Sequence, residues 1–385
     1  MTSPAPPASR LSKAKHRPAS LDRRYVGELV DDLFGEDLHA KRVEALSNGV
    51  VGVLHAASLS IHAIGAGYAA VSQGQVKHGI KQVDRWLSNP AFDVGKLAPS
   101  WVEFVVGPRN EIVVALDWTD FDKDDHTTLC AYLVTRHGRA TPLFWKTVRK
   151  SDLEGKRNGH EQEVIEKLHE SLRPEIRVTL LADRGFGDQA LYEFLGLLGW
   201  DYLIRFRGCI LVEDEHGEQK HASDWSGSGR AKMLRHVRVT ADRAEIPAVV
   251  LVHAKGMKEA WCLATSLHEK SAPDLVKLYA KRFTIEETFR DEKDIHFGLG
   301  LSATHIGDST RRDRLLFLAA ITHALLTLLG AASEETGLDR TLKANTSKKR
   351  TLSLFRQGSY WYQAMPAMRE DWLPETCNCL RPHRV

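Results

Sequence analysis

Two apolar segments that each end in an aspartate constrain the fold of this chain most. "EIVVALDW" contains Asp117 and "RVTLLADRGF" contains Asp183, and both segments have the composition of buried strands. In an α/β sheet, a carboxylate at a strand end lies on the rigid rim where ligands gather. Each aspartate also has a plain interpretation as a turn residue, because Asp is favoured in turns. Taken alone, either one is more often a turn residue than a site residue.

The segments around these two strands predict a mixed α/β domain. "EIVVALDW", "TTLCAYLVTR" and "ATPLFWKTV" have the pattern of three strands, which we expect to be consecutive and antiparallel. A helix from about His160 to Ser171 and another in "GDQALYEFLGLLGW" alternate with the strand that ends at Asp183. A second run of strands, from "DYLIRFRGCILV" to "AWCLATS", precedes a helix from Pro273 to about Lys293. An apolar helix from Arg311 to Leu329 closes the globular part.

The N-terminal region, from Tyr25 to about Leu87, has an all-helical pattern that stops at Asn89-Pro90. Glycines are expected to interrupt its helices, because they supply the backbone freedom of turns. These expected breaks lie at Gly65, Gly67 and Gly74.

One helix of this region, "QVKHGIKQVDRWLSNP", has an apolar stripe at helical spacing and a basic ridge beside it. The ridge has two interpretations: it is a solvated polar face, or it contacts DNA phosphates within a small DNA-binding domain. For a helix considered alone, the solvated face is favoured. The stripe consists of Val76, Ile80, Val83 and Leu87, and the ridge of Lys77, Lys81 and Arg85.

The net charge of only +3 does not predict a nucleic-acid partner, but the charge is unevenly distributed. Residues 1–24 are basic and rich in proline, which predicts a disordered arm. Residues 336–385 form a second basic segment, in which "KKRTLSLFRQGSYWYQ" mixes cations with aromatic rings. Such mixing suits nucleic acid and also suits dimer contacts.

The five cysteines, an odd number without the spacing of a disulfide framework, indicate a reducing cytosol. Cys377 and Cys379 resemble half of a metal site, but no second pair with zinc spacing accompanies them. The first twenty residues lack the apolar stretch of a signal peptide. We interpret the apolar segment from Leu315 to Ala332 as a buried core helix rather than a membrane span. These features predict a cytoplasmic protein without a membrane partner.

A third acid comes from the helix in "YAKRFTIEETFRDEK". At about 100° per residue, Tyr279, Arg282, Glu286 and Lys293 lie within roughly 60° of the helix circumference. A carboxylate, two cations and a phenol on one face suit a metal ligand flanked by phosphate contacts. The plain alternative is an exposed helix stabilised by pairs such as Arg282 with Glu286. Helix geometry alone favours neither interpretation.

Together these residues resemble a known family. The spacing Tyr279-x2-Arg282-x3-Glu286-x6-Lys293 is similar to the Y-R-E-K signature of bacterial insertion-sequence DDE transposases of the cut-and-paste type. "LDWTD" and "LLADRGFGD" are similar to the first and second aspartate motifs of that family, in the same order. The resemblance runs from about residue 112 to 329. It implies a ribonuclease-H-like mixed sheet flanked by helices, with a β-strand insertion at about 207–265 before the last catalytic helix.

The resemblance also implies a metal-dependent endonuclease and strand-transfer activity. Asp117, Asp183 and Glu286 would be the catalytic residues and would bind two Mg²⁺ ions, for which Mn²⁺ could substitute. The ions would activate water or a DNA 3′-hydroxyl and stabilise the leaving oxygen. The protein would then contribute mainly position and charge.

DNA contacts are implied for the other signature residues. Tyr279, Arg282 and Lys293 would hold the phosphates of the transposon end. Trp261 resembles the tryptophan that receives a flipped base when such enzymes form a DNA hairpin. A buried strand tryptophan is an equally weighted alternative. The role of Arg184 stays open between a DNA contact and an ion pair with a neighbouring carboxylate.

The implied organisation is a helical DNA-binding domain at 25–100 and a catalytic domain at 110–335. The implied partners are double-stranded DNA with the terminal inverted repeats of the element, and a second copy of the chain in the end-paired complex. Both would meet in the bacterial cytoplasm, at the nucleoid.

Three alternatives belong to other classes. A phosphohydrolase of the haloacid-dehalogenase type needs a second acid two residues after Asp117, where this chain has Thr119. A transposase-derived DNA-binding regulator would lack catalysis, yet all three acids are present. A nuclease of the same fold would cut without joining, and the Y-R-E-K helix favours transposition over it.

Overall fold

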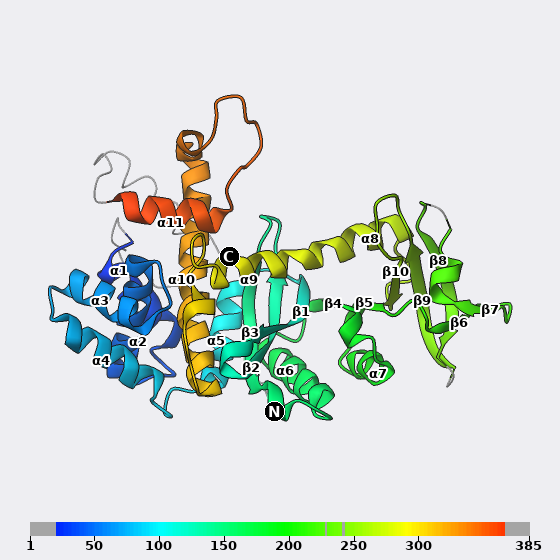
Figure 1. The fold of residues 1–385 in the computed structure, drawn as a ribbon, viewed down its shortest axis with the longest axis horizontal. Coiled ribbons are helices and arrows are strands. Elements are labelled where there is room, and N and C mark those ends of the chain that lie inside the picture. The colour runs from blue at the N-terminus through cyan, green and yellow to red at the C-terminus, as the bar shows by residue number, and fades with distance from the viewer. Residues whose placement is uncertain (1–20, 228, 241–242, 366–385) are drawn as a thin grey trace, which may run out of the picture.

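A single ten-stranded sheet runs from the centre of the protein to one end (Figure 1). The computed structural model describes residues 21–365 except 228, 241 and 242. The strand order is β3-β2-β1-β4-β5-β10-β9-β8-β6-β7. The strands are β1 (Glu111–Phe121), β2 (His126–Val134), β3 (Ala140–Arg149), β4 (Arg177–Ala182), β5 (Asp201–Phe206), β6 (Leu211–Glu213), β7 (Gln219–His221), β8 (Lys232–Val239), β9 (Ala244–Val252) and β10 (Trp261–Thr265).

The first half of the sheet has the mixed pairing of a ribonuclease-H-like fold. β1, β2 and β3 are consecutive and antiparallel, as the sequence predicts. β4 then adds to β1 in parallel and β5 adds to β4 in parallel. Parallel neighbours need crossover connections, and α6 (Arg157–Ser171) and α7 (Gln189–Leu197) lie in them. The predicted α/β fold class is confirmed.

The second half of the sheet is the β-rich block, and it continues the first half without a break. β10 pairs antiparallel with β5, so the strands from β6 to β10 extend the same hydrogen-bonded ladder. These strands span residues 211–265, within the range expected for the insertion. In Figure 1 they form the end of the molecule opposite the N-terminal helices.

Five helices build the N-terminal region, and two of the three expected glycine breaks are absent from it. Gly65 and Gly67 lie inside a helix, where their missing side chains allow close packing. A Cβ on Gly65 would lie 2.5 Å from the backbone nitrogen of Ile80. The expectation of breaks there was wrong, because a glycine serves close approach as well as turns. The helices are α1 (Arg23–Phe34), α2 (Ala40–Ala56), α3 (Ile61–Ser72), α4 (Val76–Leu87) and α5 (Val94–Val106).

The predicted arm at residues 1–24 ends earlier than expected. Asp22 caps α1 by accepting a hydrogen bond from the backbone of Tyr25, so Arg23 and Arg24 are already helical. Residues 1–20 lie outside the described part of the chain, as do Cys377 and Cys379.

The helix expected from Pro273 to Lys293 is interrupted. α8 (Ala272–Ala280) passes through one 3-10 turn, η5 (Lys281–Phe283), into α9 (Thr284–Lys293). A 3-10 turn winds more tightly than an α-helix, so the expectation of one uninterrupted helix was wrong. The contact between Arg282 and Glu286 survives the change.

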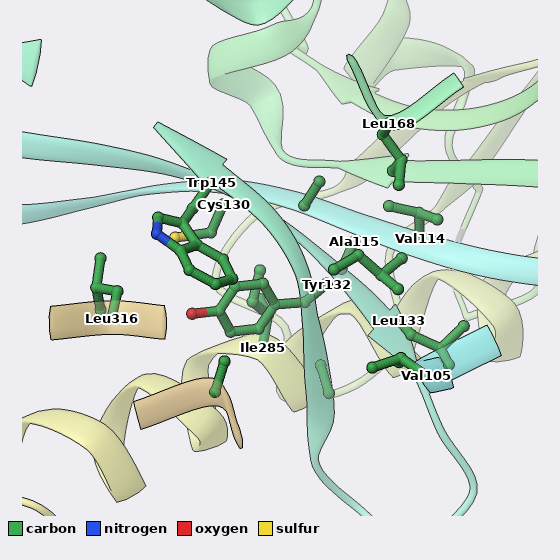
Figure 2. Close-up of a cluster of buried hydrophobic side chains, with 14 of the residues drawn as sticks. Val105, Val114, Ala115, Cys130, Tyr132, Leu133, Trp145, Leu168, Ile285 and Leu316 are labelled. Carbon is green, nitrogen blue, oxygen red and sulfur yellow. The ribbon is translucent and has the colours of Figure 1, made fainter. Parts of the chain in front are cut away.

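α10 (Ser309–Glu335) is the central core helix (Figure 1). Most of its residues are buried, including 94% of its most apolar stretch, as expected for a core helix. In Figure 2, Leu316 from α10 and Ile285 from α9 lie beside Tyr132 and Trp145 of the sheet. One apolar core therefore joins these helices to the sheet.

α11 (Leu354–Ala364), from the basic C-terminal segment, packs directly across α10. Glycines form the crossing: a Cβ on Gly330 would overlap the backbone of Leu354, and a Cβ on Gly358 would overlap that of Leu326. Arg350 in the preceding loop pairs with Glu334 of α10. Part of the basic segment is therefore built into the fold.

Replacing Gly358 by Ala should destabilise the protein by about 1–3 kcal/mol, because the added methyl group forces the two helices apart. Gly196→Ala is a matched control, since Gly196 is an exposed helical glycine with no atom near the added methyl group. The control should be neutral or more stable by up to about 1 kcal/mol. Denaturant unfolding measures both, and equal stability of the two variants would contradict the close crossing.

Candidate active site

Asp117 and Asp183 lie at the same level of the sheet, at the point where β4 ends beside β1. β1 and β4 are parallel, and their last paired residues are Leu116 and Ala182. Asp183 directly follows β4, whereas Asp117 lies inside β1, which continues beside β2 as far as Phe121. The expectation that the first strand ends at Asp117 was wrong, because β2 still pairs with β1 beyond that residue. The register of β1 with β4 nevertheless puts the two aspartates at one level. Neighbouring strands are separated by about 5 Å, which sets the spacing of the two backbones. The Asp183 side chain accepts a hydrogen bond from the backbone of Gly185 at 2.7 Å, which fixes the turn after β4.

Glu286 reaches the same region from α9, and Arg282 connects it to Asp117. One guanidinium nitrogen of Arg282 lies 2.9 Å from Asp117 Oδ2, and the other lies 2.6 Å from Glu286 Oε1. The Arg282 side chain is 7% exposed, whereas that of Glu286 is 49% exposed. The guanidinium therefore forms a buried bridge between two carboxylates from different elements.

The electrostatics of Asp117 indicate a concentration of negative charge. Burial raises its pKa to about 6. The Arg282 guanidinium opposes this rise, while Asp183 and Glu286 add to it by repulsion. Both other acids are thus close enough to act on Asp117, and Arg282 is the buried counter-charge that Asp117 and Glu286 share.

The acids of this cluster are the chemical type that binds hard divalent cations. Within the described residues, no three acidic, histidine or cysteine side chains already form a metal cage. Arg282 lies between two of the acids instead. The donor set nevertheless fits a divalent cation, because three carboxylates supply oxygen ligands and their repulsion calls for more positive charge than one guanidinium provides.

α9 is held against the start of β3 and the turn before it, which fixes Glu286. The Thr288 hydroxyl donates to the Ala140 carbonyl at 2.8 Å and accepts from the Ala140 backbone N–H at 2.9 Å. Arg139 pairs with Asp291 at 2.6 Å. These contacts lie within two turns of Glu286, so its helix is firmly attached to β3.

Lys293 lies at the far end of α9 and faces the same rim. Its ammonium group donates to the Asp120 carbonyl at 2.7 Å and lies 4.3 Å from the centre of the Phe121 ring. Burial lowers the pKa of Lys293, while nearby acids oppose the decrease. Arg312 contacts the same ring at 4.0 Å. The lysine is therefore half-buried and positioned by the end of β1.

Tyr279 and Trp261 form an aromatic cluster beside the acids, on the side of the inserted strands. Their rings meet edge to face at 5.0 Å, and Phe283 lies 6.1 Å from Trp261. Tyr279 is buried, which raises its pKa to about 12. Trp261 keeps part of its surface exposed. Tyr279 thus has a packing role in this state, and Trp261 and Phe283 present ring surface to solvent.

Two residues that sequence reasoning missed connect the rims of β1 and β4. Glu161, buried in α6, accepts from the Trp118 indole at 2.9 Å and from Arg157 at 3.0 Å. The Arg157 guanidinium lies over the rings of Trp118 and Phe186, which follow the two aspartates in sequence. The available signal was the four-residue spacing of Arg157 and Glu161 on a predicted helix.

Arg184, whose role the sequence left open, forms an ion pair in this structure. It pairs with Glu259 at 3.0 Å, and Arg205 pairs with the same carboxylate. The acids after Asp117 also have partners: Asp120 and Asp122 pair with Lys150. The ridge of Lys77, Lys81 and Arg85 lies on α4, outside this cluster.

Glu292 is a further acid of α9, buried beneath the site. The Tyr132 hydroxyl donates to it at 3.1 Å. Burial raises the pKa of Glu292 to about 8, and the hydrogen bond from Tyr132 only partly opposes the rise. Glu292 is therefore protonated in the folded protein at neutral pH.

A comparison with models of known protein families gives a match. A family model described as a transposase DDE domain matches residues 109–324, more than half of the chain, and its range includes all three acids. A search of individual curated proteins gives no match.

The raised pKa of Glu292 predicts how stability depends on pH. Between about pH 4.5 and 8 the folded state keeps a proton that the unfolded state releases, so stability decreases as pH rises through this window. Glu292→Gln removes this titration while preserving shape. Its melting temperature should fall less than that of the wild type between pH 5 and pH 8. Parallel decreases in thermal melts would show that Glu292 does not titrate in this range.

Proposed function

The chain belongs to the transposase DDE-domain family, and from this premise we propose that it moves an insertion sequence by cut-and-paste transposition. Membership makes it a transposase, an enzyme that acts on DNA through a family mechanism that uses divalent metal ions. The proposal adds the reaction course, the residues and the DNA substrate. The observation that carries it is the meeting of Asp117 and Glu286 at one buried guanidinium, next to Asp183 in strand register.

Asp117, Asp183 and Glu286 are proposed to hold two Mg²⁺ ions, with Mn²⁺ as a substitute. The ions supply Lewis-acid activation of the attacking oxygen and charge stabilisation at the leaving oxygen. The protein provides their frame: the β1–β4 ladder fixes the aspartates, and the Thr288 contact with Ala140 fixes the helix of Glu286. Preorganised ligands of this kind need little rearrangement during the reaction.

Arg282 is proposed to have two successive roles. Without metal it neutralises Asp117 and Glu286, which limits repulsion among the buried acids. With metal and DNA present, the guanidinium is released to bind a backbone phosphate. Its Nε is buried and has no hydrogen-bond partner within the described structure, so this donor would gain one only when the guanidinium moves.

The remaining signature residues are proposed to contact the transposon end. Lys293 is proposed to hold a phosphate near the end of β1. Tyr279, which is buried against Trp261, would contact DNA after local movement. Trp261 receives a flipped base during hairpin formation, a role supported by its partly exposed ring beside Tyr279. Lys77, Lys81 and Arg85 contact phosphates from the exposed side of α4.

The proposed substrate is double-stranded DNA that carries the terminal inverted repeats of the element. Pairing of two ends requires two copies of the protein, so a homodimer is proposed for the reacting complex. The reaction would take place on nucleoid DNA in the bacterial cytoplasm.

Glu286→Gln should reduce Mg²⁺-dependent nicking by at least about 100-fold while leaving DNA binding intact, because it removes one ligand charge without changing shape. The assay uses DNA with the inverted repeats that flank the gene. Glu287→Gln is the control, since Glu287 pairs with Arg139 and Arg290 outside the acid cluster. Undiminished nicking by Glu286→Gln would remove it from the metal site. A wild type that binds the ends without nicking would indicate a DNA-binding regulator.

Trp261→Ala should impair hairpin formation more than first-strand nicking, by about tenfold, because a stacked base contributes about 1–3 kcal/mol. Trp261→Phe should restore most of the hairpin product by keeping an aromatic surface. Gel analysis of both products from one reaction measures the ratio. Equal loss of both products in the Ala variant would refute the flipped-base role.

A further inference from the structure

A side-chain network on α6 joins the segments that follow the two aspartates, and the reaction proposed above does not use it. The Glu161 carboxylate accepts hydrogen bonds from the Trp118 indole at 2.9 Å and from Arg157 Nε at 3.0 Å. The Arg157 guanidinium lies 5.4 Å from the centre of the Trp118 ring and 5.6 Å from that of the Phe186 ring. We refer to Trp118, Glu161, Arg157 and Phe186 as the α6 clamp.

Glu161 occupies a costly position for a carboxylate, on the core-facing side of α6. Val164, Ile165 and Leu168 follow it at helical spacing, and all three are buried in the apolar core. The Glu161 side chain is only 4% exposed. A buried carboxylate destabilises a protein unless it is paired and hydrogen-bonded, so this one depends on the two donors of the clamp. The same buried stripe fixes α6 to the sheet and gives the clamp a rigid base.

The clamp acts on Asp117 through the next residue, Trp118. The backbone N–H of Trp118 donates to Asp117 Oδ1 at 2.9 Å, while Oδ2 accepts from Arg282 at 2.9 Å. Both oxygens of this carboxylate are therefore oriented, one of them by the residue whose indole Glu161 holds. A shift of the indole would move the peptide that orients the carboxylate.

The clamp acts on Asp183 through Phe186. β4 ends before Asp183, so a turn and not the sheet holds this acid. In that turn the Asp183 side chain accepts from the Gly185 backbone at 2.7 Å, and its carbonyl accepts from the Phe186 backbone at 3.1 Å. Phe186 is only 1% exposed and lies under the Arg157 guanidinium. Arg157 thus packs on rings from both aspartate segments.

The two aspartates need such a restraint because they repel each other. Arg282 compensates Asp117 and Glu286, but within the described residues no cation forms an ion pair with Asp183. Without a restraint, the turn that carries Asp183 could relax away from β1 and lower the repulsion. The clamp opposes this movement, because one guanidinium contacts the segments of both acids.

We propose that Glu161 and Arg157 are positioning residues, which hold Asp117 and Asp183 at the separation that a shared divalent cation requires. Residues that orient metal ligands through such outer contacts commonly affect metal affinity as strongly as about 10–100-fold. The inference rests on the proposed function only in taking these two aspartates as cation ligands. It adds that a helix outside the acid cluster sets the affinity for the cation.

The test measures Mn²⁺ binding by the full-length protein without DNA, from the electron paramagnetic resonance signal of the unbound ion. Glu161→Ala should weaken binding about tenfold. Glu161→Gln keeps an oxygen acceptor for the Trp118 indole and should restore the affinity to within about threefold of the wild type. Glu166→Ala is the matched control, since Glu166 is an exposed residue of the same helix and its loss changes the net charge equally. The control should bind as the wild type does.

Two further variants test the contacts of the clamp separately. Trp118→Phe keeps a ring beneath Arg157 but removes the indole donor, so it should weaken Mn²⁺ binding about as much as Glu161→Ala. The two changes together should weaken it no further, because they remove the same hydrogen bond. Arg157→Lys keeps the charge without the planar group and should weaken binding by about 3–10-fold. Thermal melts establish that each variant is folded.

The Mg²⁺ dependence of nicking provides a second readout. In Glu161→Ala the midpoint Mg²⁺ concentration should rise about tenfold, more than the rate at saturating Mg²⁺ falls, because the clamp does not touch the reacting atoms. A fall in the rate at every Mg²⁺ concentration with an unchanged midpoint would overturn the positioning role.

The Mn²⁺ measurements separate failure of this inference from failure of the proposed function. A wild type that binds no Mn²⁺, or that loses none of its binding in Asp117→Asn, would refute the proposed metal site itself. Wild-type binding that is lost in Asp117→Asn but equal in Glu161→Ala would overturn the clamp alone. An equal loss in Glu166→Ala, or additive losses from Trp118→Phe and Glu161→Ala, would also overturn it. Unchanged affinity in Arg157→Lys would overturn the role of Arg157.

Discussion

The parallel pairing of β1 with β4 determines where the chemistry of this protein can take place. Their paired residues are more than sixty positions apart in sequence, yet the register puts Asp117 and Asp183 at the same level of the sheet. Around this pair the chain adds supports from three sides. Glu161 and Arg157 connect the residues that follow the two aspartates. Arg282 ties α9 to the rim, and Thr288 ties it to β3.

Carboxylates that lie close together in a half-buried site repel one another. Arg282, a residue of the Y-R-E-K signature, reduces this repulsion. Arg282 is nearly inaccessible to solvent and contacts acids from a strand and a helix. Removing either acid would leave a buried charge poorly compensated, which is costly. Ile285, the residue before Glu286, packs into the apolar core beside Tyr132, and this packing anchors the helix that carries the acid (Figure 2). The charges of Asp117, Arg282 and Glu286 thus affect both the stability of the folded protein and the reactivity of the site.

Much of this arrangement could be predicted from local patterns. Apolar runs ending in Asp117 and Asp183, and the spacing of Glu286 from Arg282, are properties of short segments, so the strands, the mixed fold and the candidate acids were accessible from sequence. The features that the sequence did not predict depend on tertiary contacts. The 3-10 turn at Arg282 and the glycines inside α3 reflect packing against other elements. The same is true of Val76, which was assigned to the apolar stripe of its helix but is 45% exposed. No pattern within one segment reveals that Glu161 supports Trp118, because that contact joins a helix to a distant strand.

The inserted strands have a mechanical consequence. β10 is joined to β5, and β5 to β4, by continuous backbone pairing, so Trp261 and Asp183 belong to one stiff ribbon. A change in the separation between the partly exposed indole and the acids would therefore require the paired strands themselves to bend. A polymer that contacts both Trp261 and the acids must therefore fit the distance that the paired strands set between them. The protein can then select substrates by their length and curvature. The paired strands, and not mobile loops, set how much variation in length and curvature is accepted.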